Sequence, residues 1–421
     1  MTKLEYLTVA EALTAVLNGV ETLPVERVSL LDALGCVLGE PIVAADSLPP
    51  FANSAMDGYA FQAADVQTAS PNSPTTLEVV GDIAAGTAPD FTLLPGQAAR
   101  IMTGAPIPDG ADAVVPVEDT NEPWRQVERP LPDQIHIFRA VQPGDYVRQV
   151  GEDVVAGQQV LQAGHILRPQ EVGALASMGV SQVPVIRQPK VGILATGDEL
   201  LPVTEPLRPG KIRNSNGYTQ AAQVMALGAI PVLLGSARDT EADVREKLHA
   251  GLDAGVDLFV SSAGVSVGAY DVVKSVLVQG GNAVFWRVRM RPGKPLAFGT
   301  YQGVPYLGLP GNPVSAMVSF ERFARAAILK MAGHTRLDRP RVSVVVNEEI
   351  RSDGRESYLR SVVKREEGGG YTAVTTGGQG SHMMTSLVKA NALLIVPEGV
   401  THVAIGETLI AWMVNWPETV F

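Results

Sequence analysis

Between residues 190 and 333, short apolar runs alternate with helical patterns, and this alternation constrains the fold more than any other feature of the sequence. Residues 191–195, Val-Gly-Ile-Leu-Ala, predict a short buried strand, and residues 215–227 predict a helix with an apolar face. Further strands are predicted over 229–234 and 257–261 and around Phe285, Ala297 and Tyr306, with helices from Thr240 to Leu248 and from Asp271 onward. Strands and helices that alternate at this spacing predict a mostly parallel sheet flanked by helices.

Residues 261–268 read Ser-Ser-Ala-Gly-Val-Ser-Val-Gly and directly follow the apolar run 256–260. A β-branched and aromatic run that breaks into Gly and Ser is typical of a buried strand ending in a loop rich in backbone N–H groups. Gly lets such a loop approach an oxyanion without a Cβ in the way. The loop therefore predicts a site for a phosphorylated or otherwise anionic ligand.

Three similar loops lie in the same part of the chain, at 196–199 (Thr-Gly-Asp-Glu), 213–216 (Arg-Asn-Ser-Asn) and 309–313 (Leu-Pro-Gly-Asn-Pro). Each loop alone is equally well explained by a tight turn or a helix cap. Asn312 followed by Pro313 is a good helix start, because Pro fits the first helical position. Ligands of parallel sheets bind at the carboxyl ends of the strands, so four such loops at one sheet edge favour a binding site.

Basic residues gather between 287 and 295, where the chain reads Arg-Val-Arg-Met-Arg-Pro-Gly-Lys-Pro. In an extended segment this alternation places Arg287, Arg289 and Arg291 on one face. A solvated edge strand protected from aggregation is the alternative explanation. In a chain of net charge −11, three Arg and Lys294 beside Gly-rich loops favour oxyanion binding.

Three carboxylates, Glu199, Asp239 and Asp271, each follow a predicted strand or stand at a predicted helix start. Carboxylates at helix starts stabilise the helix dipole, which is one explanation of Asp239 and Asp271. The functional alternative is Mg²⁺ ligation beside a phosphate, because that ion prefers hard oxygen donors. The sequence has neither a His cluster nor a Cys pair that would indicate a zinc site, and His382 suits a structural role as well as a ligand role.

The composition argues against several classes of protein. A net charge of −11 and a pI near 5.1 disfavour general binding to nucleic acid or to anionic membranes, which attract a basic surface. The sequence shows neither a targeting segment nor an apolar run near the roughly 20 residues of a membrane span. We therefore expect a cytoplasmic protein with no membrane association. The single Cys36 cannot form an internal disulfide and suits a small buried side chain.

The length of 421 residues predicts several domains, because it exceeds one ordinary core. Helical patterns run from Val9 to Val20 behind a Thr8–Glu11 capping box, over a shorter piece from Ser29 to Leu34, and from Pro169 to Met178. The predicted division is a discontinuous N-terminal module of residues 1–46 and 141–185, an inserted β-rich module of residues 47–140, an α/β domain of residues 186–335 and a C-terminal all-β domain of residues 336–421.

Eight motifs follow one another over nearly the whole chain: SAMDGYA (54–60), RIMTGAP (100–106), TGDEL (196–200), RNSN (213–216), VSVGAYD (265–271), RPGKP (291–295), LPGNPVSA (309–316) and QGSHM (379–383). Together they resemble the molybdopterin molybdenumtransferase family, which includes bacterial MoeA and the gephyrin E domain. Adenylyltransferase-type and competence-damage-type proteins would share only the loops of the α/β domain. The resemblance implies a multidomain α/β plus β fold. Its parts are a three-layer α/β/α domain with a mostly parallel sheet, an inserted β-rich module, an elongated N-terminal helical and β module, and a small C-terminal barrel-like β domain.

The resemblance implies the last step of molybdenum cofactor synthesis, in which adenylylated molybdopterin and molybdate react in the presence of Mg²⁺ to give the cofactor and AMP. The residue types suit this chemistry, because Gly, Arg and Lys can replace the water shell of a tetrahedral dianion. Mg²⁺ neutralises the charge of a phosphate that is being cleaved. The resemblance also implies a homodimer, in which residues 1–46 and 141–185 form the linker and dimerisation module. It further implies an upstream molybdopterin adenylyltransferase and recipient molybdoenzymes as partners.

Carried over position by position, the resemblance implies roles for individual residues. The implied catalytic residues are Asp57, Thr103, Glu199, Asp239 and Asp271, and the implied metal ligands are Asp153, Glu199, Asp239 and Asp271. The implied cofactor-binding residues are Gly197, Ser262, Gly264, Ser266, Gly268, Arg287, Arg291, Lys294, Pro310, Asn312, Pro313, Arg360 and Ser381. The family's cleft is completed by the partner subunit, so Asp57 and Thr103 are expected to serve either their own site or the neighbour's.

Two residues depart from the family pattern: Ala263 stands where Gly is usual, and Arg291 where Lys is usual. Arg keeps the charge but presents a planar fork instead of a point charge, so molybdate affinity is the property most affected. Two other functions stay open, a gephyrin-like scaffold without catalysis and an insertase that prefers tungstate. The chain has no long Pro- or Ser-rich linker, which favours the enzyme over the scaffold. Molybdate and tungstate are too similar in size and charge for the sequence to separate them.

Overall fold

The computed structural model describes residues 5–122, 130–262 and 272–415, and the chain divides into two compact units. The first unit consists of Met1–Glu40, Gly164–Val172 and Gln182–Phe421, and the second of Pro41–Ala163 and Gly173–Ser181. Each unit has a hydrophobic core of its own.

A seven-stranded mixed sheet forms the centre of the first unit, in the order β1-β18-β20-β21-β17-β13-β16. The strands are β1 Glu5–Leu7, β13 Lys190–Thr196, β16 Ile230–Ala237, β17 Leu258–Ser262, β18 Gly281–Val288, β20 Pro295–Tyr301 and β21 Val304–Leu309. β20 pairs antiparallel with β18 and with β21, whereas the other neighbours pair in parallel. Gln302 and Gly303, with φ of 48° and 84°, form the two-residue turn between β20 and β21, which suits a tight hairpin. The predicted mostly parallel sheet is confirmed.

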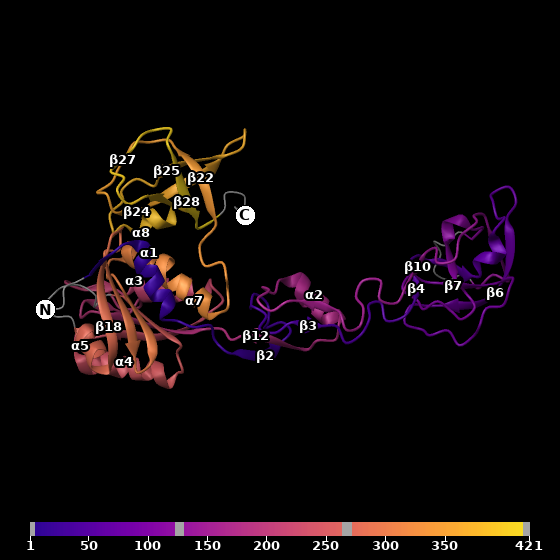
Figure 1. The fold of residues 1–421 in the computed structure, drawn as a ribbon, viewed down its shortest axis with the longest axis horizontal. Helices are drawn as coiled ribbons and strands as arrows, with labels where there is room; N and C mark the ends of the chain where they lie inside the picture. The colour runs from indigo at the N-terminus through magenta and orange to yellow at the C-terminus, as the bar shows by residue number, and fades with distance from the viewer. Residues whose placement is uncertain (1–4, 123–129, 263–271, 416–421) are drawn as a thin grey trace. The chain divides into compact units, whose positions relative to one another are not determined.

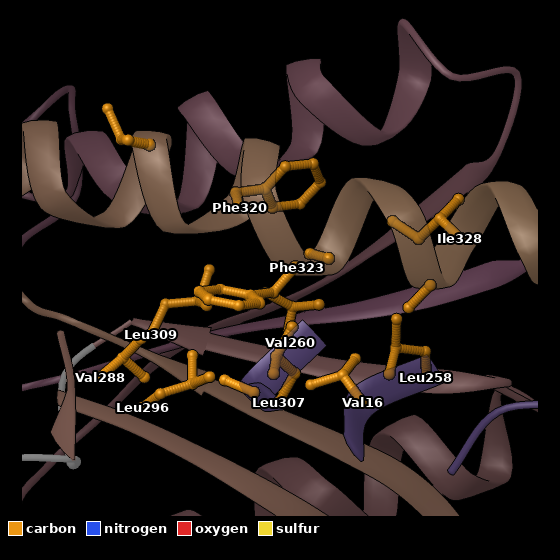
Figure 2. Close-up of a cluster of buried hydrophobic side chains, with 14 of the residues drawn as sticks. Val16, Leu258, Val260, Val288, Leu296, Leu307, Leu309, Phe320, Phe323 and Ile328 are labelled. Atoms are coloured by element: carbon orange, nitrogen blue, oxygen red, sulfur yellow. The ribbon is translucent and has the colours of Figure 1, made fainter. Parts of the chain in front are cut away.

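Successive residues of the central strands point to opposite faces of this sheet. On one face Ile193, Val260 and Leu307 belong to a core with side chains from several helices. These helices are α1 Val9–Asn18, α3 Ser215–Met225, α6 Pro313–Ser319, the π-helical turn Phe320–Ala324 and α7 Arg325–Met331. Figure 2 shows Phe320 and Phe323 above Val260 and Leu307 in this core. Burial of each such side chain contributes roughly 1.5–3 kcal/mol, so the layer is held by many separate contacts.

On the other face Leu194, Phe259 and Tyr306 pack with α4 (Glu241–Asp253) and α5 (Val272–Gly280). Figure 1 shows α4 and α5 on the side of the sheet opposite α1, α3 and α7. The sequence explains this division, because neighbouring residues such as Phe259 and Val260 are both apolar and a strand sends them to opposite sides. The predicted three-layer α/β/α arrangement is confirmed.

Helices α1, α3 and α4 begin where the sequence predicts. Glu11 N donates to Thr8 Oγ1 (3.1 Å) and Thr8 N donates to Glu11 Oε2 (2.8 Å), which forms the capping box of α1. Asn214 caps α3 and Thr240 caps α4 through their side-chain oxygens. Each such cap contributes about 0.5–2 kcal/mol. None of the described helices is long and apolar enough to cross a membrane.

The helical piece predicted from Ser29 to Leu34 is wrong. Ser29 ends β2 (Val25–Ser29), which pairs antiparallel with β12 (Gln182–Ile186), and turns follow. Leu31 and Leu34 are 78% and 52% exposed. The segment therefore has no apolar face to bury, and a helix this short is not stable without tertiary packing.

The C-terminal β domain of the first unit is a closed barrel, which confirms the prediction. Its strands pair in the order β24-β25-β22-β28-β26, and β26 pairs again with β24. The strands are β22 Arg341–Val346, β24 Glu356–Arg365, β25 Tyr371–Thr375, β26 Ala392–Val396 and β28 Thr408–Met413, accompanied by β23 Ile350–Arg351, β27 His402–Val403 and α8 Met384–Val388. β19 (Met290–Arg291) pairs with the start of β24, and Tyr358, Leu393 and Trp412 share the core of α6 and α7. These contacts fasten the barrel to the α/β layers (Figure 1).

The second unit is rich in strands, as predicted for the inserted module. Its five-stranded sheet has the order β8-β5-β7-β6-β9, around a core that includes Tyr59 and Phe61. Its elements are β3 Ile42–Val43, β4 Asn53–Ser54, β5 Gly58–Phe61, β6 Thr75–Ile83, β7 Gln97–Ile101, β8 Ala113–Pro116, β9 Gln134–Ile137, β10 Val147–Arg148, β11 Gln159–Leu161 and the 3₁₀-helices Ala63–Val66 and Val117–Asp119. The division between the units falls within α2 (Pro169–Ser177). The predicted domain limits at residues 46, 140, 185 and 335 stay a prediction.

Candidate active site

A cleft of about 980 Å³ lies in the first unit, at the carboxyl ends of β13 and β17. The last residue of each of these strands lines it. The segments 212–216, 291–295, 310–313 and 379–382 complete its wall, the last of them from the barrel. The carboxyl ends of parallel strands are where α/β sheets bind ligands. Here three of the four predicted loops meet at one site with Ser262, and the rest of the fourth loop, from residue 263 onward, lies outside the described residues.

Asparagine side chains fasten the loops around the cleft to one another. Asn216 Nδ2 donates to Gly311 O (2.7 Å), which joins the start of α3 to the loop before α6. Asn312 occupies the N-cap position of α6, but its Nδ2 donates to Ser381 Oγ of the barrel (3.0 Å) and its side chain does not cap the helix. Val314 N donates to Ser381 O (3.0 Å). The start of α6 therefore fixes how closely the barrel approaches the sheet edge.

The wall of the cleft carries a net positive charge. Among the described residues, Arg213, Arg291, Lys294 and Arg355 line it, and Glu199 is the carboxylate that faces them. The start of α3, where Arg213 and Asn214 lie, adds backbone N–H groups and the positive end of a helix dipole. The chain as a whole has a charge of −11, so the cations are gathered locally and favour an anionic ligand.

Asp353 partly neutralises two of these cations. Arg355 Nε donates to both of its carboxylate oxygens (3.2 and 3.1 Å), and Arg291 Nη1 lies 3.6 Å from Oδ2. The hydrogen bonds from Arg355 lower the pKa of Asp353 below its ordinary value. Two guanidinium groups around one carboxylate leave one net positive charge in this cluster.

Glu199 follows the turn after β13, and its carboxylate folds back over Gly197. Gly197 has a φ of 144°, and a Cβ at this position would collide with the Glu199 carboxylate. Asp239 is not among the described residues that line the cleft. Its N–H donates to Asp198 Oδ1 (3.2 Å), and Asp198 N–H donates to Asp239 Oδ2 (3.4 Å). These reciprocal hydrogen bonds join the turns after β13 and β16.

The donor set of these turns is compatible with Mg²⁺. In the described residues no three His, Cys, Asp or Glu side chains come together as a metal site. Asp271, the third predicted ligand, lies outside the described residues. Mg²⁺ commonly keeps several waters and takes one or two carboxylates together with substrate phosphates, so Glu199 and Asp239 supply the kind of ligand that it needs.

The structure brings some of the predicted binding residues together and places others elsewhere. Ser262, Arg291, Lys294, Pro310, Asn312, Pro313 and Ser381 line the cleft. Arg287 instead donates from Nη1 to the Tyr6 hydroxyl (2.7 Å), which lowers the pKa of Tyr6. Arg360 is 1% exposed and donates from Nε to Ser386 Oγ (3.0 Å). Ala263, Gly264, Ser266, Gly268 and Asp271 lie outside the described residues.

Three of the predicted residues belong to the second unit. Asp57 Oδ1 accepts hydrogen bonds from Thr103 N (2.7 Å) and Thr103 Oγ1 (2.8 Å), so these two residues form one pair. Asp153 N donates to Leu48 O (3.0 Å) in the same unit. The sequence motifs that contain Asp57 and Thr103 are thereby joined into a single local structure.

Arg355 lines the wall but lies in none of the sequence motifs, and Gln379 was named only as part of the QGSHM motif, with no role of its own. Gln379 Oε1 accepts from Arg360 N (3.0 Å) and its Nε2 donates to Arg360 O (3.1 Å). Arg355 reaches the cleft because β19 pairs with β24. Pairing between segments so far apart in the chain leaves no local signal in the sequence, whereas the QGSHM motif marks the segment that carries Gln379.

The sheet, the cation-lined cleft at its edge and the barrel beside it define an anion-binding α/β protein. Family models match three successive parts of the chain: the MoeA N-terminal region (domain I and II) matches residues 7–179, the probable molybdopterin binding domain residues 192–330, and the MoeA C-terminal region (domain IV) residues 343–412. The chain belongs to the molybdopterin molybdenumtransferase family.

Curated relatives and a solved structure agree with this assignment. The chain is 41% identical over 393 residues to molybdopterin molybdenumtransferase 2 of Mycobacterium tuberculosis, covering 91% of this chain and 94% of the relative. It is 39% identical over 391 residues to molybdopterin molybdenumtransferase of Nostoc sp., covering 91% and 88%. A crystal structure of the molybdopterin biosynthesis moeA protein from Pyrococcus horikosii matches with a TM-score of 0.80 and 28% identity, over 98% of this chain and 100% of that one.

Proposed function

We propose that this chain is a molybdopterin molybdenumtransferase, which uses the cleft to insert molybdate into adenylylated molybdopterin with release of AMP. The observation that carries the proposal is the positive wall of the cleft in a chain of net charge −11. Both substrates are anions, so such a wall attracts both of them. The family to which the chain belongs supports the identity of the substrates.

The residues of the wall suit a tetrahedral dianion. Arg291 and Lys294 supply charge-assisted donors, and the hydroxyls of Ser262 and Ser381 supply neutral ones. Arg presents a planar fork and Lys a compact ammonium, so the two cations offer donors of different geometry to one oxyanion. Together these groups replace the water that molybdate loses when it enters the cleft.

We propose Mg²⁺ as the metal that assists AMP release, held by Glu199 and Asp239 with Asp271. When bound, this ion would neutralise charge that develops on the phosphate of the adenylate. Glu199 contributes to the wall from the turn after β13, and Asp239 follows β16. Asp153 in the second unit stays a proposed further ligand.

We infer that the working protein is a homodimer in which both units contribute to the reaction. The Asp57–Thr103 pair lies in the second unit and the cleft in the first. An upstream molybdopterin adenylyltransferase would deliver the substrate in the cytoplasm, and molybdoenzymes would receive the product.

Incubation of the purified protein with adenylylated molybdopterin, Mg²⁺ and molybdate tests the proposal. We expect AMP release that depends on molybdate, and recovery of activity when the product is added to an apo-molybdoenzyme. Tungstate in place of molybdate measures the oxyanion preference. AMP retained by a folded, dimeric protein under all of these conditions would overturn the proposal and favour a non-catalytic scaffold.

A further inference from the structure

Arg355 enters the cleft wall from the barrel. It lies between β23 and β24, and the parallel pairing of β19 with β24 sets Met290 opposite Glu356 and Arg291 opposite Ser357. Arg355 therefore lines the cleft together with Arg291 and Lys294, although the three residues are supplied by two distant segments of the chain.

The Arg355 guanidinium is held from two sides. Its Nε donates to Asp353 Oδ2 (3.1 Å) and its Nη2 to the same oxygen (2.5 Å), while its Nη1 donates to Met290 O (3.1 Å). The Asp353 carboxylate also accepts from Arg355 N (3.2 Å), which closes the turn on itself. A side chain held in this way loses little rotamer freedom when a ligand binds, so its binding energy is not spent on ordering.

Part of the Arg355 guanidinium remains available to a ligand. A guanidinium carries five N–H donors, and the contacts with Asp353 and Met290 use Nε and one hydrogen on each terminal nitrogen. One N–H on each terminal nitrogen remains, and the side chain is 34% exposed. Such charge-assisted N–H donors suit the oxygens of a tetrahedral oxyanion.

Arg360, the barrel arginine to which the family resemblance assigns substrate binding, has a different environment. It is 1% exposed, and its Nη2 donates to the carbonyl oxygens of Gly378 (3.4 Å) and Gly380 (3.1 Å). Arg360 thus holds the segment that carries Ser381, whereas Arg355 is the barrel guanidinium among the described residues that line the cleft.

We propose that Arg355 is an oxyanion-binding residue of this cleft, which grips molybdate together with Arg291 and Lys294, and that Asp353 is its positioning residue. The proposal rests on the proposed function, since it names the substrate of that same site. A purely structural role, in which Arg355 only ties β19 to the barrel through Met290, is the alternative.

Direct titration of the full-length protein with molybdate, by calorimetry, tests the proposal separately from catalysis. Arg355→Gln should weaken molybdate binding about tenfold or more, because it removes charge-assisted hydrogen bonds. Arg355→Lys, which keeps the charge but not the fork, should lie between Arg355→Gln and the unchanged protein. Arg351→Gln is the matched control, because Arg351 is an 84% exposed barrel arginine paired with Glu349. It should bind molybdate as the unchanged protein does.

The kinetics of AMP release then test whether Asp353 positions Arg355 for molybdate binding. Asp353→Asn should raise KM for molybdate by several-fold with a smaller change in kcat, because the guanidinium is still present but less well held. Molybdate affinity within twofold of the unchanged protein in folded Arg355→Gln would overturn the proposal. Should the unchanged protein bind molybdate but release no AMP, the proposed function fails while the titration still decides the role of Arg355.

Discussion

Arg360 is a buried cation whose side-chain partners are neutral. Its Nε donates to Ser386 Oγ (3.0 Å) and its Nη2 to Gly380 O (3.1 Å) and Gly378 O (3.4 Å). Burial, and to a lesser degree the nearby Arg291, lowers the pKa of Arg360. A guanidinium remains charged in spite of such a shift. The three acceptors therefore replace the hydrogen bonds to water that Arg360 loses on burial.

Arg360→Met should therefore destabilise the protein through the acceptors that it leaves behind. Each buried carbonyl or hydroxyl without a donor costs about 1–3 kcal/mol, and we expect a loss of about 2 kcal/mol or more in the free energy of unfolding. Urea denaturation measures it. The control is Arg351→Met at an 84% exposed position of the same barrel, which should change stability by less than about 0.5 kcal/mol. Equal denaturation midpoints for both variants would contradict this account.

Gly197→Ala should impair both folding and catalysis. The φ of 144° at Gly197 is accessible to Gly but strained for Ala, and the new methyl group would displace the Glu199 carboxylate. Strain of this kind costs about 1–3 kcal/mol, whereas the displaced carboxylate should lower kcat for AMP release about tenfold or more. Steady-state kinetics at saturating Mg²⁺ measure the effect.

The control for that variant is Gly173→Ala in α2. Gly173 has helical surroundings and an added Cβ would meet nothing within 4 Å, so Ala should leave kcat unchanged and stabilise the helix slightly. An unchanged kcat in Gly197→Ala would show that the position of the Glu199 carboxylate over Gly197 does not matter to the reaction.

At the scale of elements, the sequence predicts the start of a helix correctly where residues of one short segment determine that start. The capping box of Thr8 and Glu11, and Thr240 at the start of α4, depend on residues three positions apart and were predictable. Asn312 was correctly placed at the start of α6, but the sequence could not show that its side chain bonds Ser381 of the barrel. The segment 29–34 failed for the opposite reason, since its leucines have helical spacing but no neighbouring surface to cover them.

The start of α4 should make stability depend on pH. Hydrogen bonds from Arg238 lower the pKa of Asp243 from 3.8 to about 2. A carboxyl group whose pKa is lower in the folded state stabilises the fold above its unfolded pKa, and this contribution is lost as the pH falls from near 3.8 towards 2. Asp243→Asn should therefore be less stable than the unchanged protein near neutral pH, and the difference should shrink through this acidic window.

Denaturation of both proteins at a series of pH values measures the difference in their free energy of unfolding. NMR titration of the Asp243 carboxyl carbon measures the pKa of this group in the folded protein. The control is Glu246→Gln in the same helix, whose side chain is 76% exposed, because exposed charge pairs contribute little. A stability difference for Asp243→Asn that stays constant down to the lowest pH would exclude the Arg238 pairing as its cause.

At the scale of the whole molecule, some residues of the cleft can be predicted from the sequence, whereas others are revealed only by the tertiary structure. The loops at 213–216 and 309–313 were predicted to meet because parallel strands share one carboxyl edge, and they do line one cleft. Arg355 and the barrel segment 379–382 reach the same cleft through the pairing of β19 with β24 and through Ser381. Neither contact has a periodicity or a turn signal in the sequence, so only the packed first unit reveals them.

The separate cores of the two units predict that the protein does not unfold in one step. Trp412 is 2% exposed in the core that joins the barrel to α6 and α7, and its ring lies 5.1 Å from Arg322 Cζ. Phe61 is fully buried in the core of the second unit. Replacement of either aromatic residue by Ala should cost about 3–5 kcal/mol, but the loss should fall on different parts of the chain.

Scanning calorimetry of the unchanged protein should accordingly show two transitions, because units with their own cores need not unfold together. Trp412→Ala should lower the temperature of one transition and weaken molybdate binding, since the same core holds the barrel wall of the cleft. Phe61→Ala should lower the other transition and leave molybdate binding by the first unit intact. If both substitutions shifted a single transition by the same amount, the units would be one cooperative structure, and molybdate affinity would fall in both variants once the shared transition approached the assay temperature.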